Sequence, residues 1–369
     1  MARSGIRMRP TLIVRLMNRP VLLSVAFCVC FFLSRAYSHE DTFEVDVRYV
    51  RQIGPLLSTA QQFAGPFGVS LSKRNRLWIA DDLGHSVILF DNDGKVVREF
   101  NCHGQAPGCF SYVDAVIEGP GGLLYVADTG NNRVQLLNPD GTAKGMIKRW
   151  NLYSMGLSNP RDVALDGDGG LFVADWGNHC IRNFSIEGEY RSSIGSRGQG
   201  QGQFEHPIAI AFDDNGNLYV SDFGNHRIQK FDSSGEFIKI IGQQGTRVGE
   251  FINPAGIAFD QNGWLYIVDR GNSRIQVFDQ NDRPITSFGK LGSDPLEFKH
   301  PTDIATSEDG LLYVVDQGNQ RVLVYEVETD PNLSQEAPSK NERDSIKPKS
   351  TMENLLYRQE DPSHSDSSN

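Results

Sequence analysis

The chain has 369 residues, of which 39% are hydrophobic, 37 are glycine and 17 are proline, which is enough apolar material for a large folded domain and argues against a wholly disordered chain. It carries 46 acidic and 36 basic residues, for a formal net charge of -10. Because such a surface repels phosphate backbones and anionic lipid headgroups, composition disfavours nucleic acid and the membrane surface as partners.

Residues 1–38 have the features of an export signal. They hold six arginines and no acidic residue, then an apolar run over residues 21–33, then Ala36-Tyr37-Ser38, with small residues where signal peptidase reads. In a helix the run covers only about 20 Å, short of the ~30 Å hydrocarbon core of a bilayer. We therefore expect a cleaved signal peptide and a secreted or periplasmic protein. The alternative is an uncleaved anchor, the only case in which a membrane is an expected partner.

Two cysteines, Cys102 and Cys109, flank a loop that contains glycine and proline. In an oxidising compartment such a pair can close a disulfide, which leaves Cys180 over. The alternative is a metal site that also uses His103, but it lacks a fourth ligand and matches no common zinc spacing. The sequence therefore favours the disulfide, and we expect no metal or other cofactor.

A repeat of 47 residues governs the rest of the chain. It is marked by six equally spaced aspartates: Asp81, Asp128, Asp175, Asp222, Asp269 and Asp316. A fixed period of this size is typical of solenoids and propellers. Each unit has four short β-type segments, and Asn-Gly or Asp-Gly pairs such as Asn262-Gly263 mark the tight turns between the first and second segments. Four antiparallel strands repeated six times predict an all-β, six-bladed β-propeller.

The two ends of the repeat region predict how the ring closes. Residues 52–54 stand four periods before residues 240–242, which end a fourth strand, whereas the last unit stops near Glu328 after three strands. We predict that residues 43–54 supply the missing strand of the last blade, which makes residues 39–328 one closed propeller without an exposed sheet edge. Residues 329–369 are rich in Ser, Pro, Lys and Glu, and are predicted to be a disordered tail.

Four units share the motif Asp-x-Gly-Asn-x-Arg-Ile/Val, at residues 128–134, 222–228, 269–275 and 316–322. Gly and Asn accommodate a strained turn, and the Asp carboxylate can accept hydrogen bonds from loop amides or from the Arg five residues later. We expect these Asp and Arg side chains to be structural and to tie blades together. The first and third units have Ser86 and Cys180 where Arg is expected, so both are predicted to lose the tie.

With this motif the sequence resembles the NHL-repeat family of six-bladed propellers over about residues 43–328. Asn178-His179 and Asn225-His226 carry part of the motif that gives the family its name. Among similar folds, the peptidyl-hydroxyglycine amidating lyases bind zinc through histidines directly after the proline that starts the first strand. This chain has none there: Phe67, Asp114, Arg161, Ile208, Ala255 and Thr302 occupy those positions. Other NHL proteins bind RNA through a basic face, which the acidic composition disfavours.

The residue after each motif Asp varies freely: Asp82, Thr129, Trp176, Phe223, Arg270 and Gln317. These side chains are predicted to project from loops on one face. Trp176 and Phe223 stand in neighbouring blades beside Arg270, which predicts a contact site for a protein, peptide or glycan. The alternative is that they pack on adjacent loops.

The start of the innermost strand gives a second candidate site on the same face. Arg161, Asp162, Asp303 and Asp114 are predicted to converge at the mouth of the central channel, where carboxylates beside an arginine can bind a cation or polarise a substrate. A solvated rim is the alternative. No nucleophile elbow, phosphate-binding loop or HExxH signature is present, so we assign no catalytic residue. The sequence favours an exported binding scaffold, and the alternative is a metal-dependent lyase or hydrolase with its site at the central channel.

Overall fold

The computed structural model describes residues 45–54, 63–72, 74–148 and 156–328. The predicted signal peptide and the predicted disordered tail lie outside the described residues. Within the described ranges, no helix combines the length and apolar character needed to span a membrane.

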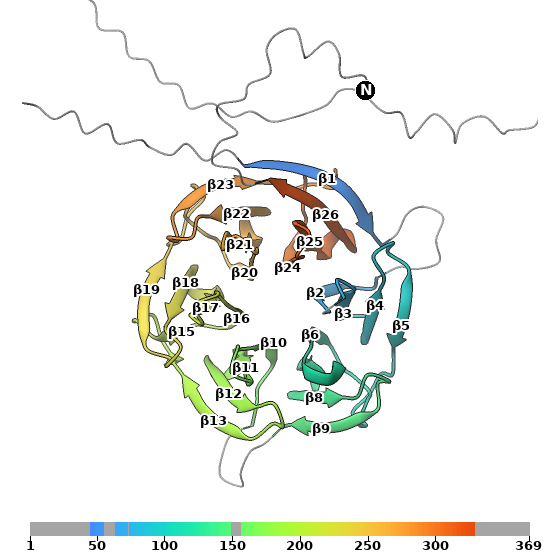
Figure 1. Cartoon of the computed structure of the whole chain (residues 1–369). Helices are drawn as coiled ribbons and strands as arrows, with labels where there is room; N and C mark the ends of the chain where they lie inside the picture. Colours follow the sequence, from blue (N-terminus) through green and yellow to red (C-terminus); the bar gives the residue numbers. More distant parts are fainter. Residues whose placement is uncertain (1–44, 55–62, 73, 149–155, 329–369) are drawn as a thin grey trace, which may run out of the picture. The chain divides into compact units, whose positions relative to one another are not determined.

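Six four-stranded antiparallel sheets are arranged in a ring, with the first strand of each blade innermost (Figure 1). Blade 1 consists of β2 (Pro66–Leu71), β3 (Leu77–Asp81), β4 (Ser86–Phe90) and β5 (Val96–Phe100). Blade 2 consists of β6 (Val113–Glu118), β7 (Leu124–Asp128), β8 (Arg133–Leu137) and β9 (Ala143–Ile147). Blade 3 consists of β10 (Pro160–Leu165), β11 (Gly170–Asp175), β12 (Cys180–Ser185) and β13 (Tyr190–Ile194). Blade 4 consists of β16 (Pro207–Phe212), β17 (Leu218–Asp222), β18 (Arg227–Phe231) and β19 (Phe237–Ile241). Blade 5 consists of β20 (Pro254–Phe259), β21 (Leu265–Asp269), β22 (Arg274–Phe278) and β23 (Pro284–Phe288).

Blade 6 is closed by the N-terminal strand. It joins β24 (Pro301–Thr306), β25 (Leu311–Asp316) and β26 (Arg321–Glu328) with β1 (Asp46–Ile53) as its outermost strand. β1 and β26 pair antiparallel from Asp46 opposite Glu328 to Ile53 opposite Val322. The all-β, six-bladed propeller and its closure by the N-terminal segment are therefore confirmed. Pairing the two ends covers the edge that β26 would otherwise expose.

The core lies between blades. Second strands such as β7 and β21 are buried along their whole length, whereas the outer strand β5 is mostly exposed. This explains why second strands have continuous apolar sequences: both of their faces are covered by neighbouring blades. Phe110, Phe204, Phe251 and Phe298 recur in the segments that precede first strands, and each is fully buried.

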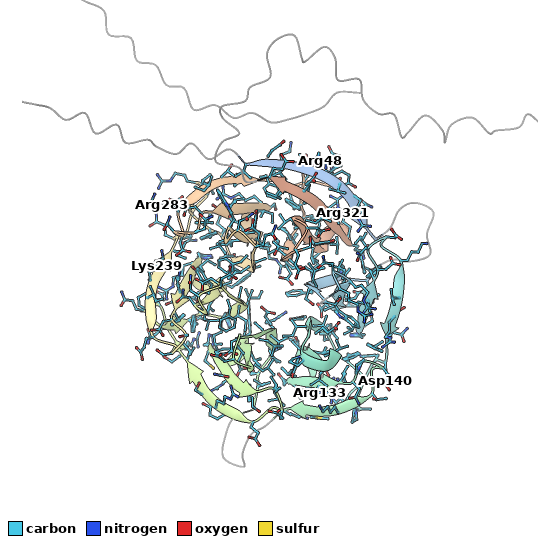
Figure 2. The ribbon with its side chains drawn as sticks, viewed as in Figure 1. Arg48, Arg133, Asp140, Lys239, Arg283 and Arg321 are labelled. Carbon is cyan, nitrogen blue, oxygen red and sulfur yellow. A yellow bond between two sulfur atoms is a disulfide. The ribbon has the colours of Figure 1, made fainter. Side chains whose placement is uncertain are left out.

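The six motif aspartates are buried, with at most 3% of their surface exposed. In blades 2, 4, 5 and 6, the Arg five residues later donates Nε to the carboxylate at 2.6 to 2.8 Å; Arg133 and Arg321 are labelled in Figure 2. The same guanidinium also holds the loop that leads into its blade. Arg227, for example, donates to the carbonyls of Gln199, Gly200 and Gln203. The predicted structural role of the Asp and Arg side chains is confirmed.

The predicted loss of the tie in blade 3 is wrong. Arg182 donates Nε to Asp175 Oδ2 at 3.1 Å, although Cys180 occupies the usual Arg position. Because side chains two residues apart point to the same side of a strand, residue 182 faces the aspartate as residue 180 does. In blade 1, where no arginine pairs with Asp81 among the described residues, the carboxylate accepts backbone amides of Ala64 and Gly65.

The loop between blades 1 and 2 is closed by a disulfide. Cys102 and Cys109 are bonded, with their Cα atoms 4.4 Å apart, which confirms the pairing favoured by the sequence. Cys180 is a buried free thiol. Since the two sulfurs bond to each other, the alternative of a metal site on this loop does not apply.

Candidate functional site

Five of the six blade junctions contribute two residues in the left-handed conformation to the face that carries the motif turns. The first follows the turn after the second strand, as His179 does at φ 53°, and the second precedes the next blade's first strand, as His206 does at φ 60°. At four junctions the first side chain accepts a hydrogen bond from the backbone N–H of the second: His85 from Tyr112, Asn132 from Asn159, His179 from His206 and His226 from Asn253. The histidine of the family motif therefore accepts a hydrogen bond that links neighbouring blades, a role that the sequence analysis missed.

The variable residues after the motif aspartates begin the 3-10 turns η3 (Trp176–Asn178), η4 (Phe223–Asn225) and η5 (Arg270–Asn272). The rings of Trp176 and Phe223 lie 5.3 Å apart, half-buried against the interblade core. Arg270 donates Nη2 to Gln317 Oε1 of the next blade at 3.1 Å. The two aromatic side chains thus pack on each other, yet both keep part of their surface accessible.

Arg161 joins the two predicted sites into one. From β10 it donates Nη1 to Asp114 Oδ2 at 2.7 Å. Its guanidinium carbon lies 5.0 Å from the Trp176 ring centre and 5.6 Å from that of Phe67, so it is held between a carboxylate and two aromatic rings. We call Arg161, Asp114, Trp176, Phe223 and Arg270 the mouth cluster. It combines residues that the sequence analysis assigned to the loops and to the channel.

The carboxyl groups beside Arg161 are electrostatically unusual. Burial raises the pKa of Asp114 to about 7 and that of Asp82 to about 6, although the charge of Arg161 opposes both shifts. Burial, together with the nearby charge of Arg161, lowers the pKa of Arg270. Asp82 Oδ1, Asp114 Oδ1 and Arg161 Nε are buried and have no hydrogen-bond partner among the described residues.

Asp162 and Asp303 occupy equivalent positions on the first strands of blades 3 and 6. Asp162 Oδ2 accepts the amide of Ile210 and Asp303 Oδ2 that of Val69, each at 2.8 Å, so both carboxyls hold the first strand of the following blade. Burial raises the pKa of both, that of Asp303 to about 7, and the charge of Asp303 further disfavours ionisation of Asp162. Asp162 and Asp303 thus accept hydrogen bonds from backbone amides, whereas Asp114 accepts one from the side chain of Arg161.

Small residues let the first strands approach at this level. Gly68, Ala115, Ala209 and Gly256 occupy the positions equivalent to Asp162 in the other blades. A Cβ atom on Gly256 would lie 2.6 Å from the Cα atom of Asp303, so no larger residue fits there.

Comparison with known proteins agrees with this architecture. The NHL repeat family model matches residues 157–184, 204–231, 251–278 and 298–325, in blades 3 to 6. The chain therefore carries four NHL repeats within a six-bladed β-propeller. No curated protein matches its sequence.

Solved structures show the same fold at low identity. Virginiamycin B lyase from Staphylococcus aureus, solved as a catalytically inactive variant with quinupristin, is 16% identical, with a TM-score of 0.53 over 79% of this chain and 90% of the lyase. A gluconolactonase from Xanthomonas campestris is 14% identical, with a TM-score of 0.56 over 76% of this chain and 98% of its own. A protein of unknown function from Bacteroides thetaiotaomicron is 18% identical, with a TM-score of 0.60 over 78% and 76% of the two chains. At these identities the likeness concerns the fold alone.

Proposed function

We propose that this chain is an exported NHL-repeat propeller that binds a protein, peptide or glycan at the mouth cluster. The observation that carries the proposal is the placement of Arg161, which is held by Asp114 and lies within 5.6 Å of the ring centres of both Phe67 and Trp176. An arginine fixed in this way loses little side-chain entropy when a ligand docks on it. The arginine-rich leader and the disulfide support the exported location.

The composition of the mouth cluster suits recognition of a partly apolar ligand with a polar group. Trp and Arg are the residue types that dominate binding energy at interfaces, and a hot-spot side chain costs about 2 kcal/mol or more when truncated. Trp176 and Phe223 offer ring surface, while Arg161 and Arg270 offer donors for a carboxylate, carbonyl or hydroxyl oxygen. The other side chains at the turn ends differ from blade to blade, which suits a ligand that is not symmetric.

The alternative is a metal-dependent lyase or hydrolase with its site at the channel mouth. It is favoured by Asp82 and Asp114, whose raised pKa values of about 6 and about 7 suit proton transfer near neutral pH. A lyase and a gluconolactonase are among the proteins of similar fold. This alternative predicts that a captured ligand is released chemically altered.

The test is a screen of the exported protein on glycan and peptide arrays, followed by affinity measurement on the hits. We expect Trp176→Ala and Arg161→Ala each to weaken binding by about tenfold or more, the level of a hot-spot residue. Arg191→Ala, on the exposed outer strand β13, is the control and should leave affinity unchanged. If Trp176→Ala and Phe223→Ala leave the affinity for every ligand unchanged, binding does not use this face. Mass spectrometry of the recovered ligand separates binding from turnover.

A further inference from the structure

A cluster of metal-ligating side chains lies at the junction of blades 3 and 4, beside the mouth cluster. His179, Glu205 and His206 each place one ligand atom within 4.8 Å of the others. We propose that these three residues form a binding site for a divalent transition-metal ion such as Zn²⁺. This site goes beyond the ligand binding proposed above, since it uses none of the residues of the mouth cluster.

The spacing of the ligand atoms is close to that of a metal site. Glu205 Oε1 lies 3.6 Å from His206 Nδ1 and 3.9 Å from His179 Nδ1. Bonds of about 2.0–2.1 Å to a tetrahedral zinc ion place ligand atoms about 3.3–3.5 Å apart, so the two distances from Glu205 are within about 0.6 Å of that spacing, and the two histidine atoms lie within 4.8 Å of each other. Two histidines and one glutamate also form the protein ligand set of a known class of catalytic zinc sites, which keep a position open for water or substrate.

The repeat itself does not account for this set. The hydrogen bond between blades needs only an acceptor at the first left-handed position and a backbone N–H at the second. It therefore explains a histidine at position 179, but neither the imidazole of His206 nor the carboxylate of Glu205. The equivalent positions at three other junctions hold Asn132, Ser158 and Asn159; His226, Ile252 and Asn253; and Ser273, Lys299 and His300. None of these junctions combines three ligands.

Two existing interactions compete with the ion. Arg197 donates Nε and Nη2 to Glu205 at 3.2 Å each, but its side chain is 72% exposed, so this pair is readily exchanged. His179 Nδ1 accepts the N–H of His206 at 3.2 Å, and an ion on Nδ1 displaces that hydrogen bond. The three ligand side chains are 12%, 25% and 38% exposed, which leaves the site open to an ion from solvent.

The neighbouring indole makes the site observable. The Trp176 ring stacks on the His206 ring, with centres 4.6 Å apart and planes at 20°. A paramagnetic ion such as Cu²⁺ bound by His206 therefore lies close enough to quench Trp176 fluorescence. Zn²⁺ has no such effect, but by competing for the same ligands it should restore the signal.

The experiment is a titration of the full chain, without affinity tag, with Zn²⁺ by calorimetry and with Cu²⁺ by fluorescence. His206→Asn introduces the residue that stands at position 253, and Glu205→Gln keeps the size of the side chain. Each should lower Zn²⁺ affinity at least about tenfold, since removing even an outer-shell partner of a ligand costs 10–100-fold. His226→Asn is the matched control in the next blade and should leave Zn²⁺ affinity unchanged. Arg197→Ala should raise affinity, because it frees Glu205.

The site would be overturned if the unaltered chain did not bind Zn²⁺, or if His206→Asn and Glu205→Gln bound Zn²⁺ as tightly as the unaltered chain. It would also be overturned if His226→Asn lost as much Zn²⁺ affinity as these two variants. Trp176→Phe should abolish most of the Cu²⁺ quenching without changing the calorimetric Zn²⁺ affinity. If it lowers both, the ion lies at the mouth cluster instead. Ligand binding by the mouth cluster is measured separately, so failure of either proposal leaves the other standing.

Discussion

Replacing Arg227 with alanine tests whether the buried arginine ties stabilise the ring. Arg227 donates Nε to Asp222 at 2.8 Å, and its Nη atoms donate to three loop carbonyls at 2.7 to 2.9 Å. Both side chains are buried, with 10% and 0% exposed. Removing one partner of a buried ion pair costs about 3–5 kcal/mol, because the remaining charge is left uncompensated.

The structure places the expected loss at the lower end of that range. Asp222 keeps hydrogen bonds from the amide of Glu205 and from Asn225 and Gln229, so its carboxylate remains partly satisfied. We expect the free energy of unfolding to fall by about 3 kcal/mol. Urea unfolding followed by far-UV circular dichroism measures this loss.

Arg197→Ala is the control for this experiment. Arg197 also pairs with a carboxylate, but its side chain is 72% exposed, so its removal should cost at most about 1 kcal/mol. A loss below about 1 kcal/mol for Arg227→Ala would refute the reasoning, since the tie would then be worth no more than an exposed ion pair.

Three further predictions concern closure, pH and the disulfide. Deleting residues 46–53 removes β1, so we expect the exposed edge of β26 to cause aggregation, visible by size-exclusion chromatography; a monodisperse product would contradict this. The pKa of Asp114 is raised from 3.8 to about 7, so its carboxyl stabilises the fold at acid pH and this contribution is lost as pH rises through about 7. Asp114→Asn should therefore flatten the pH dependence of unfolding between these values, and an unchanged profile would argue against the shift. Replacing Cys102 and Cys109 with serine opens a short loop and should cost about 2.5 kcal/mol by loop-closure entropy; thermal unfolding with and without reductant measures it.

The architecture could be predicted from the amino-acid sequence alone. Aspartates 47 residues apart, with tight-turn residues at constant positions between them, predict six equal blades, and the three-stranded last unit predicts that residues 43–54 complete it, where the structure has β1 at Asp46–Ile53. These features are readable because each rests on interactions within a blade or on chain length. The Cys102–Cys109 disulfide belongs to the same class, since both cysteines flank one short loop.

Which side chains meet in the mouth cluster and between blades could not be predicted in this way. Arg161 reaches Asp114 of the preceding blade and Trp176 of its own blade, and His179 meets His206 from the next blade. These partners are 15 to 47 residues apart, and no local motif specifies the contacts, because they arise only when the strands and the neighbouring blades pack together. The hydrogen bond that Arg182 donates to Asp175 was missed for a related reason. It depends on which side of β12 faces the aspartate, and the spacing of the motif does not show that residue 182 lies on that side.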